Sequence, residues 1–144
     1  MAKLHPQRRS QAKARLRIFG NKPFMRFARK FGASEKNLWD AHNDAADADL
    51  GGGVFKFRLA REGQGERGGA RSIVAMNDGE RVVMMFGFEK KDQANINANE
   101  LKGFKKLAAA YLKLTQEQVE KLVRDGELIE IKAPLTHGGP HKKK

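Results

Sequence analysis

Residues 81–88 constrain the fold more than any other part of the sequence, because nearly every position in them is apolar. They run Arg-Val-Val-Met-Met-Phe-Gly-Phe, without the alternation of a strand that faces water on one side. Such a segment, preceded by the turn-forming pair Asp78-Gly79, indicates a strand covered on both faces. We therefore expect a central strand, joined by a hairpin to another strand at residues 70–76.

Residues 54–61 show the opposite pattern. Phe55 and Phe57 share one parity, while Lys56 and Arg58 share the other. Successive side chains of a strand point to opposite faces, so one face should enter the core and the other should hold two neighbouring cations. Like charges side by side repel, so folding alone does not explain the pair. The pattern indicates either an anion-binding face or a merely solvated strand face.

The N-terminal part of the chain predicts one strand and two helices. Residues 15–20 alternate enough to form a short strand that ends at Gly20. An apolar stripe at helical spacing then predicts an amphipathic helix with Phe24, Phe27, Ala28 and Phe31 on its core side. A second helix, capped by Ser34, is expected to run to about Ala48, before the glycine triplet at residues 51–53 breaks the pattern.

The C-terminal part predicts two more helices and a short extended segment. Asn97 with Glu100, and Thr115 with Gln118, each match a capping box at a helix start. The first of these helices carries an apolar stripe of Leu101, Phe104, Ala108 and Tyr111. Residues 127–131 are expected to form a short strand or an extended clamp.

Charge is high and unevenly distributed. Lysine and arginine number 29 against 17 acidic residues, which gives a net charge of +12. Such an excess attracts phosphate backbones and favours a nucleic-acid target, with a solubility charge or an acidic protein partner as alternatives. Residues 1–14 are basic without periodicity and predict a flexible arm. Residues 133–144 predict a disordered basic tail, so that one domain spans residues 15–132.

Several kinds of site are excluded or disfavoured. The chain has no cysteine, which rules out disulfides, thiolate zinc sites and a cysteine nucleophile. No apolar run approaches the ~20 residues of a membrane helix, so we expect a cytoplasmic protein. The four histidines (His5, His42, His137 and His141) are scattered, and the acids form no metal-binding pattern. We therefore expect no metal and no cofactor.

The glycines of the segment from residue 62 to 69 match a dinucleotide-binding motif only by letters. Gly63-x-Gly65-x-x-Gly68 has the right spacing, but that motif must lie between a strand and a helix. Here a strand follows. The better interpretation is a flexible cationic loop that carries Arg67.

Residues 50–75 carry a family resemblance. They run Leu-Gly-Gly-Gly-Val-Phe-Lys-Phe-Arg-Leu-Ala-Arg-Glu-Gly-Gln-Gly-Glu-Arg-Gly-Gly-Ala-Arg-Ser-Ile-Val-Ala, which resembles the RelE/ParE superfamily of toxins from type II toxin–antitoxin systems. The later Phe-Gly-Phe-Glu-Lys and the closing Gly-Glu-Leu-Ile-Glu-Ile fit as well, so the resemblance covers residues 15–131. It implies an α+β, microbial-ribonuclease-type fold. Two N-terminal helices would pack on a small twisted antiparallel sheet, with further helices at the C-terminus, and the opposite concave face would bind the target.

The resemblance also implies an activity, partners and site residues. RelE-type members cleave messenger RNA in the ribosome without a metal, whereas ParE-type members inhibit DNA gyrase. Lys56, Arg58 and Arg71 match the basic catalytic positions, and Lys56 is the better candidate base if neighbouring cations depress its pKa. The expected nucleic-acid-binding residues are Arg61, Arg67, Lys90 and Lys91. A cognate antitoxin, of the helix-turn-helix DNA-binding type, is expected to cover the basic face.

Two positions depart from the family pattern. Ala70 stands where relatives place an aromatic residue before the motif arginine, and Gln93 stands where they often place an arginine. A general acid is not identifiable from the sequence. Two hypotheses therefore stay open: a ribosome-dependent messenger-RNA endonuclease, and a non-catalytic inhibitor of gyrase or plain RNA- or ribosome-binding module.

Overall fold

The computed structural model describes residues 16–42, 46–61, 63, 65–77 and 80–133, without the side chains of residues 65–68. The predicted basic arm at residues 1–14, most of the predicted tail, and the Asp78-Gly79 turn lie outside these described residues. Within them, no helix has both the length and the apolar character needed to cross a membrane.

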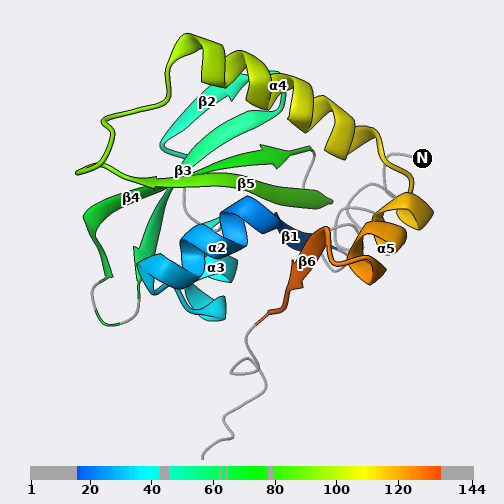
Figure 1. Ribbon diagram of the computed structural model, residues 1–144, viewed down its shortest axis with the longest axis horizontal. Helices are drawn as coiled ribbons and strands as arrows, with labels where there is room; N and C mark the ends of the chain where they lie inside the picture. The colour runs from blue at the N-terminus through cyan, green and yellow to red at the C-terminus, as the bar shows by residue number, and fades with distance from the viewer. Residues whose placement is uncertain (1–15, 43–45, 62, 64, 78–79, 134–144) are drawn as a thin grey trace, which may run out of the picture.

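The described residues form a six-stranded sheet in the order β2-β3-β4-β5-β1-β6 (Figure 1). Its strands are β1 (Arg17–Asn21), β2 (Ala48–Gly51), β3 (Val54–Arg61), β4 (Gly65–Met76), β5 (Arg81–Glu89) and β6 (Leu128–Ile131). Strands β2 to β5 form the predicted antiparallel hairpins, and β6 runs antiparallel to β1. Strand β1, however, is parallel to β5, so the prediction of a wholly antiparallel sheet is wrong. No tight turn links these two strands, and turn geometry therefore does not set their relative direction.

Two N-terminal helices cover one face of the sheet. Helix α2 (Lys22–Phe31) begins at Asn21, whose side chain accepts a hydrogen bond from the backbone of Phe24, and it buries Phe24, Ala28 and Phe31 as predicted. These residues pack with Phe57, Leu59, Val82 and Met84 of the sheet. The apolar stripe of α2 thus faces the β3 side chains that the alternating pattern assigned to the core.

Helix α3 (Glu35–Ala41) is shorter than predicted. The expected helix to Ala48 is wrong because the chain turns into β2, where Ala48 pairs with Lys56. The backbone N–H of Asp47 already donates to the Lys56 carbonyl, at 2.7 Å. Sheet pairing thus overrides a segment whose local sequence favours a helix.

Two C-terminal helices cover the other face. Helices α4 (Ala98–Lys113) and α5 (Gln116–Arg124) begin with the two predicted capping boxes. Ala108 and Val119 pack in a second core with Ile73, Val83 and Met85 of the sheet. Strand β5 is therefore covered on both faces, as predicted. Helices α4 and α5 thus lie on the face opposite α2, where the resemblance places the target-binding surface.

The glycine-rich segment is more ordered than predicted. Strand β4 begins at Gly65, which pairs with Arg61 across a register shift in the hairpin. The predicted loop through residue 69 is therefore wrong, because β4 extends through this segment, from Gly65 to Met76. Gly69 takes a positive φ of 75°, a conformation that other residues rarely adopt.

A β-bulge in β5 decides what lies beside the basic residues. Ile73 pairs with Phe86, but Val74 pairs with Met84, so Met85 is the extra residue. The bulge turns both Phe86 and Phe88 toward α4. Gly87 consequently faces α2, where an added Cβ would lie 2.3 Å from the ring of Phe27.

This close approach gives a stability prediction. Gly87→Ala should lower the free energy of unfolding by about 1–3 kcal/mol, because the Phe27 ring has to move within a packed core. Gly103→Ala is the matched control. Gly103 lies on exposed α4 with nothing within 4 Å of an added Cβ, so it should gain about 0.5–1 kcal/mol. Urea unfolding of both variants measures the difference, and equal effects would contradict the packing argument.

Candidate functional site

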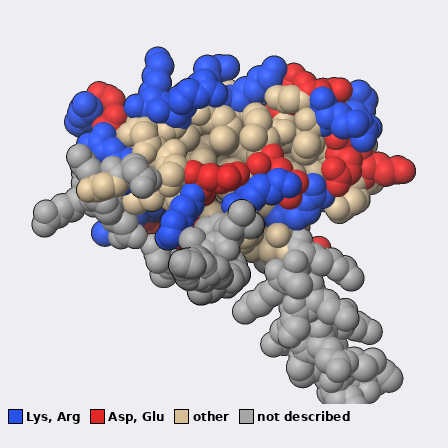
Figure 2. Space-filling view, turned by 90° about the horizontal axis from the view of Figure 1, so that it is seen from below, with Lys and Arg blue, Asp and Glu red and all other residues tan. Residues whose placement is uncertain are grey.

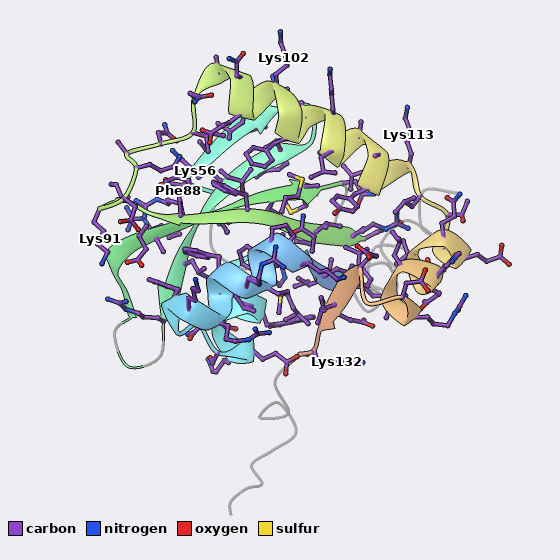
Figure 3. All side chains as sticks on the ribbon, viewed as in Figure 1. Lys56, Phe88, Lys91, Lys102, Lys113 and Lys132 are labelled. Atoms are coloured by element: carbon purple, nitrogen blue, oxygen red, sulfur yellow. The ribbon has the colours of Figure 1, made fainter. Side chains whose placement is uncertain are left out.

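Three of the predicted basic residues come together at one end of the sheet. Arg58 of β3 pairs with Arg71 of β4, and Lys56 lies two residues before Arg58 on the same face. This is the face of α4 and α5. Figure 3 labels Lys56 of β3 and Phe88 of β5 at this end of the sheet, and Phe88 pairs with Arg71 in the register of the sheet. We call Lys56, Arg58 and Arg71 the basic cluster.

An aspartate that the sequence analysis did not select organises the basic cluster. The Asp47 carboxylate accepts a hydrogen bond from Nε of Arg71 at 3.1 Å. It also lies 4.0 Å from Nζ of Lys56 and 3.9 Å from Nε of Arg58. One carboxylate therefore touches all three cations and offsets part of their mutual repulsion.

These contacts change the acidity of Asp47. Burial acts to raise its pKa, but the hydrogen bond from Arg71 and the charges of Arg71, Lys56 and Arg58 outweigh burial and lower it. Asp47 is thus an ionised carboxylate at neutral pH. Sequence reasoning missed it because Asp47 was placed in a long helix. The signal lay in the glycine triplet at residues 51–53, which folds the preceding residues back onto β3.

The three cations differ in their access to solvent. The Arg71 side chain is 10% exposed and also donates to the Ala70 carbonyl at 3.1 Å. The Lys56 side chain is 16% exposed, whereas that of Arg58 is 55% exposed. Arg71 is therefore a fixed charge within the sheet, and Arg58 is the group best placed to meet an anion from solution.

The loop between β5 and α4 closes one side of the cluster. Lys56 Nζ donates to Oδ1 of Asn95 at 3.4 Å, and the same oxygen accepts from the backbone of Ile96. Gln93 donates its side-chain amide to the Asn95 carbonyl at 2.9 Å. Gln93 thus holds the loop that contacts Lys56.

The four predicted binding residues are not all part of this group. Arg61 lies over the ring of Phe31, 4.8 Å from its centroid, which places it on the α2 side of the sheet. Lys90 and Lys91 are exposed in the turn after β5, with the stem of Lys90 lying against Gly69. The Arg67 side chain lies outside the described part of the chain.

The aromatic residues near the cluster serve the core. Phe88 is 4% exposed, and Phe86 packs on Phe104 with ring centroids 5.2 Å apart, so core packing is confirmed for both. Ala70 is completely buried, beside Leu59 and facing α2. A larger side chain at residue 70 would enter the core on the far side of the sheet from Lys56. Its absence therefore removes no base-stacking surface from the cluster.

Three cations and one carboxylate leave an excess of positive charge at an accessible end of the sheet. Guanidinium and ammonium groups at this spacing suit the oxygens of a phosphate group. Among the described residues, no three His, Asp or Glu side chains gather closely enough to hold a metal ion. The three cations are suited to binding a phosphodiester.

Comparison with known proteins identifies a family. A protein-family model for the RelE toxin of the RelE/RelB toxin–antitoxin system matches residues 16–131, which include both helical layers and every strand. A search among curated proteins finds no significant match.

The role of Asp47 can be tested through stability. Asp47→Asn should lower the free energy of unfolding at pH 7 by about 1 kcal/mol, because Arg71 loses a charged partner. The pKa of Asp47 is lower in the folded state than in the unfolded state. This contribution is therefore present above about pH 4 and disappears as the pH falls through the folded-state pKa.

Denaturant unfolding at pH 7 and at acid pH measures the contribution of the Asp47 carboxylate to the free energy of unfolding. The gap between wild type and Asp47→Asn should narrow in acid, while Asp92→Asn, in the exposed turn after β5, should stay close to wild type at both pH values. A gap that is constant with pH would show that the carboxylate charge is irrelevant.

Proposed function

The chain belongs to the RelE toxin family of the RelE/RelB toxin–antitoxin system, and from this premise we propose that it is a ribosome-dependent endonuclease of messenger RNA that works without a metal. The observation that carries the proposal is the accessible Arg58 beside the half-buried Lys56 and the fixed Arg71. A toxin of this family has a cognate antitoxin as its partner.

The proposed reaction uses the RNA itself as the nucleophile. The 2′-hydroxyl loses its proton, its oxygen bonds to the adjacent phosphorus, and the bond from phosphorus to the 5′ oxygen breaks. The 5′ oxygen takes up a proton, and the products are a 2′,3′-cyclic phosphate and a 5′-hydroxyl end. Negative charge grows on the phosphoryl oxygens along this path, so fixed cations lower the barrier.

The environments of the three cations support different roles. Arg58 is exposed and, within the described part of the chain, is held by a 3.9 Å contact to Asp47, which suits it to bind the phosphoryl oxygens directly. Arg71 is buried and doubly held, which suits it to supply a preorganised positive charge. Lys56 is the group of the three that can exchange a proton, because arginine stays protonated.

Asp47 is proposed as a positioning residue. Its closest contact is with Arg71, so an incoming phosphate can take Arg58 from Asp47 while the pair with Arg71 stays intact. Before RNA binds, the carboxylate keeps three neighbouring cations compatible with folding. We assign a similar role to the antitoxin, of the helix-turn-helix DNA-binding type, which would supply acidic groups that cover the basic cluster.

A second candidate function rests on Gln93. An amide cannot donate a proton as an acid, and the side chain of Gln93 is already bound to the Asn95 carbonyl. This observation favours a chain that binds its target without cutting it, as in inhibitors of DNA gyrase. A supercoiling assay with purified gyrase tests this second function. If the variants that inhibit gyrase are the same ones that arrest growth, gyrase inhibition would replace the nuclease proposal.

The nuclease proposal predicts the effect of single substitutions. Arg58→Ala should reduce cleavage of messenger RNA on translating ribosomes by about 100-fold or more, because a cation facing the developing charge is lost. Lys56→Ala should reduce it by a similar factor through lost proton transfer. Sequencing of RNA 5′ ends, with single-turnover rates, measures both.

Lys121→Ala is the matched control, because Lys121 is an exposed lysine of α5 paired with Asp125 at 2.9 Å. It should cleave like wild type. No cleavage by wild-type protein that demonstrably binds ribosomes would refute the proposal, as would full activity in both cluster variants.

A further inference from the structure

The outer face of α4 carries a row of lysines that the proposed reaction does not use. Its members are Lys102, Lys105, Lys106 and Lys113, all exposed, and we call them the α4 ridge. Figure 3 shows Lys102 and Lys113 pointing away from the molecule. The acid of α4 is Glu100, and its carboxylate is occupied as the acceptor of its capping box, at 2.8 Å from the Asn97 nitrogen.

Some of the lysines elsewhere on the described surface are neutralised by acids. Four pair with carboxylates: Lys22 with Glu127, Lys36 with Asp40, Lys121 with Asp125 and Lys132 with Glu130. Lys30, Lys90 and Lys91 are exposed without an ion pair among the described residues, but each lies on another element and not on a helix face with four lysines. On the face seen in Figure 2, basic and acidic side chains likewise lie next to one another. Within the part of the chain that the structure describes, none of the four ridge ammonium groups has an ion-pair or hydrogen-bond partner.

Helix stability does not explain the ridge. Lys102 and Lys106 lie four residues apart on one face, where like charges destabilise a helix by about 0.2–0.5 kcal/mol. A glutamate at Ala98 or Ala110 would form a favourable pair with one of them, yet these positions hold alanine. Helices α3 and α5 contain such pairs, so the ridge keeps its charge against a local preference.

The ridge is structurally connected to the basic cluster. Helix α4 follows directly after the loop in which Asn95 accepts a hydrogen bond from Lys56. Lys105 lies against the turn between β2 and β3, where its Cγ would be 3.2 Å from a Cβ added at Gly52. The helix that carries the ridge thus begins directly after the loop that closes one side of the basic cluster.

We propose that the α4 ridge is a second RNA-binding site, which holds the phosphate backbone of RNA beyond the segment at the basic cluster. The inference rests on the proposed function in taking RNA as the ligand and the basic cluster as the first place where it is held. From Lys102 to Lys113 the helix rises about 16 Å, and a strand presents a phosphate about every 3.4 Å of its axis, so several phosphates fall within reach. Flexible ammonium groups without a neighbouring aromatic ring bind such a backbone independently of sequence.

The composition of this face favours RNA over a protein partner. Between the lysines lie Gly103, Ala109 and Ala110, all exposed. Protein interfaces usually have an apolar or aromatic centre. Among the described residues, the exposed large hydrophobic side chain is Ile129, on β6. The ridge offers charge and close approach but no apolar anchor.

The test removes three ridge charges from the full-length chain. Lys102→Gln, Lys106→Gln and Lys113→Gln are combined, since glutamine keeps the helix propensity of lysine. Affinity for a single-stranded RNA oligonucleotide and for an RNA hairpin is measured at several salt concentrations. We expect about tenfold weaker binding at 0.1 M salt, and a slope of log affinity against log salt that is shallower by about 2.

The control removes the same charge from paired lysines, as Lys22→Gln, Lys121→Gln and Lys132→Gln. It should keep a slope close to that of wild type. Equal losses in both triple variants would mean that only net charge matters and would overturn the proposal. Unchanged RNA binding by the ridge variant would also overturn the proposal. Binding to polyglutamate, a probe for an acidic protein partner, is measured in parallel. A ridge variant that loses only this binding would overturn the proposal in the same way.

Cleavage kinetics distinguish a failure of the ridge proposal from a failure of the nuclease proposal. The ridge variant should need more RNA for half-maximal cleavage and keep the same maximal rate, whereas Lys56→Ala should lose rate. If wild type proves inactive as a nuclease but the ridge variant alone loses RNA affinity, the nuclease proposal fails and the ridge proposal stands.

Discussion

Strand β5 must be buried on both faces, and the arrangement of the rest follows from that requirement. Its apolar side chains alternate between two cores, one beneath α2 and α3 and the other beneath α4 and α5. Once both faces are covered, a large ligand can reach the sheet only at its ends and edges. The basic cluster lies at such an end, where the loop from residue 90 to 97 leads into α4. The two-layered core thus fixes where binding can occur, while individual side chains decide what is bound.

The sequence was informative wherever periodicity was strong. The parity of β3 predicted that Lys56 and Arg58 share a face, and the family resemblance added Arg71 on the neighbouring strand. Capping boxes predicted the starts of α4 and α5 correctly. Each of these features depends on residues a few positions apart, which is the range over which local rules hold.

Features that depend on pairing between distant segments were not predictable. Asp47 reached the cluster because β2 pairs with β3, although the local pattern favoured a helix. The same limit applies to Ala70, whose core position became evident only from the sheet. Arg61 is a different case. It was expected beside Arg58, but the alternation of β3 gives it the parity of Phe57 and Leu59, and it lies on their face, over the ring of Phe31. A shift of one residue in the pairing register of a strand moves each of its side chains to the opposite face of the sheet. An error in strand pairing therefore misplaces whole side chains.

Under the nuclease function that we propose, the composition of the basic cluster bears on why cleavage would require a ribosome. In-line displacement puts the attacking 2′ oxygen and the departing 5′ oxygen on opposite sides of phosphorus, and each needs a proton transfer. Within the basic cluster, Lys56 is the group suited to such a transfer, because the arginines retain their protons and Asp47 is bound to Arg71. One amine cannot serve both sides of the phosphorus at once. The second proton carrier then has to come from outside the cluster, and a ribosomal site that holds the messenger RNA in the strained in-line geometry can supply both the carrier and the alignment.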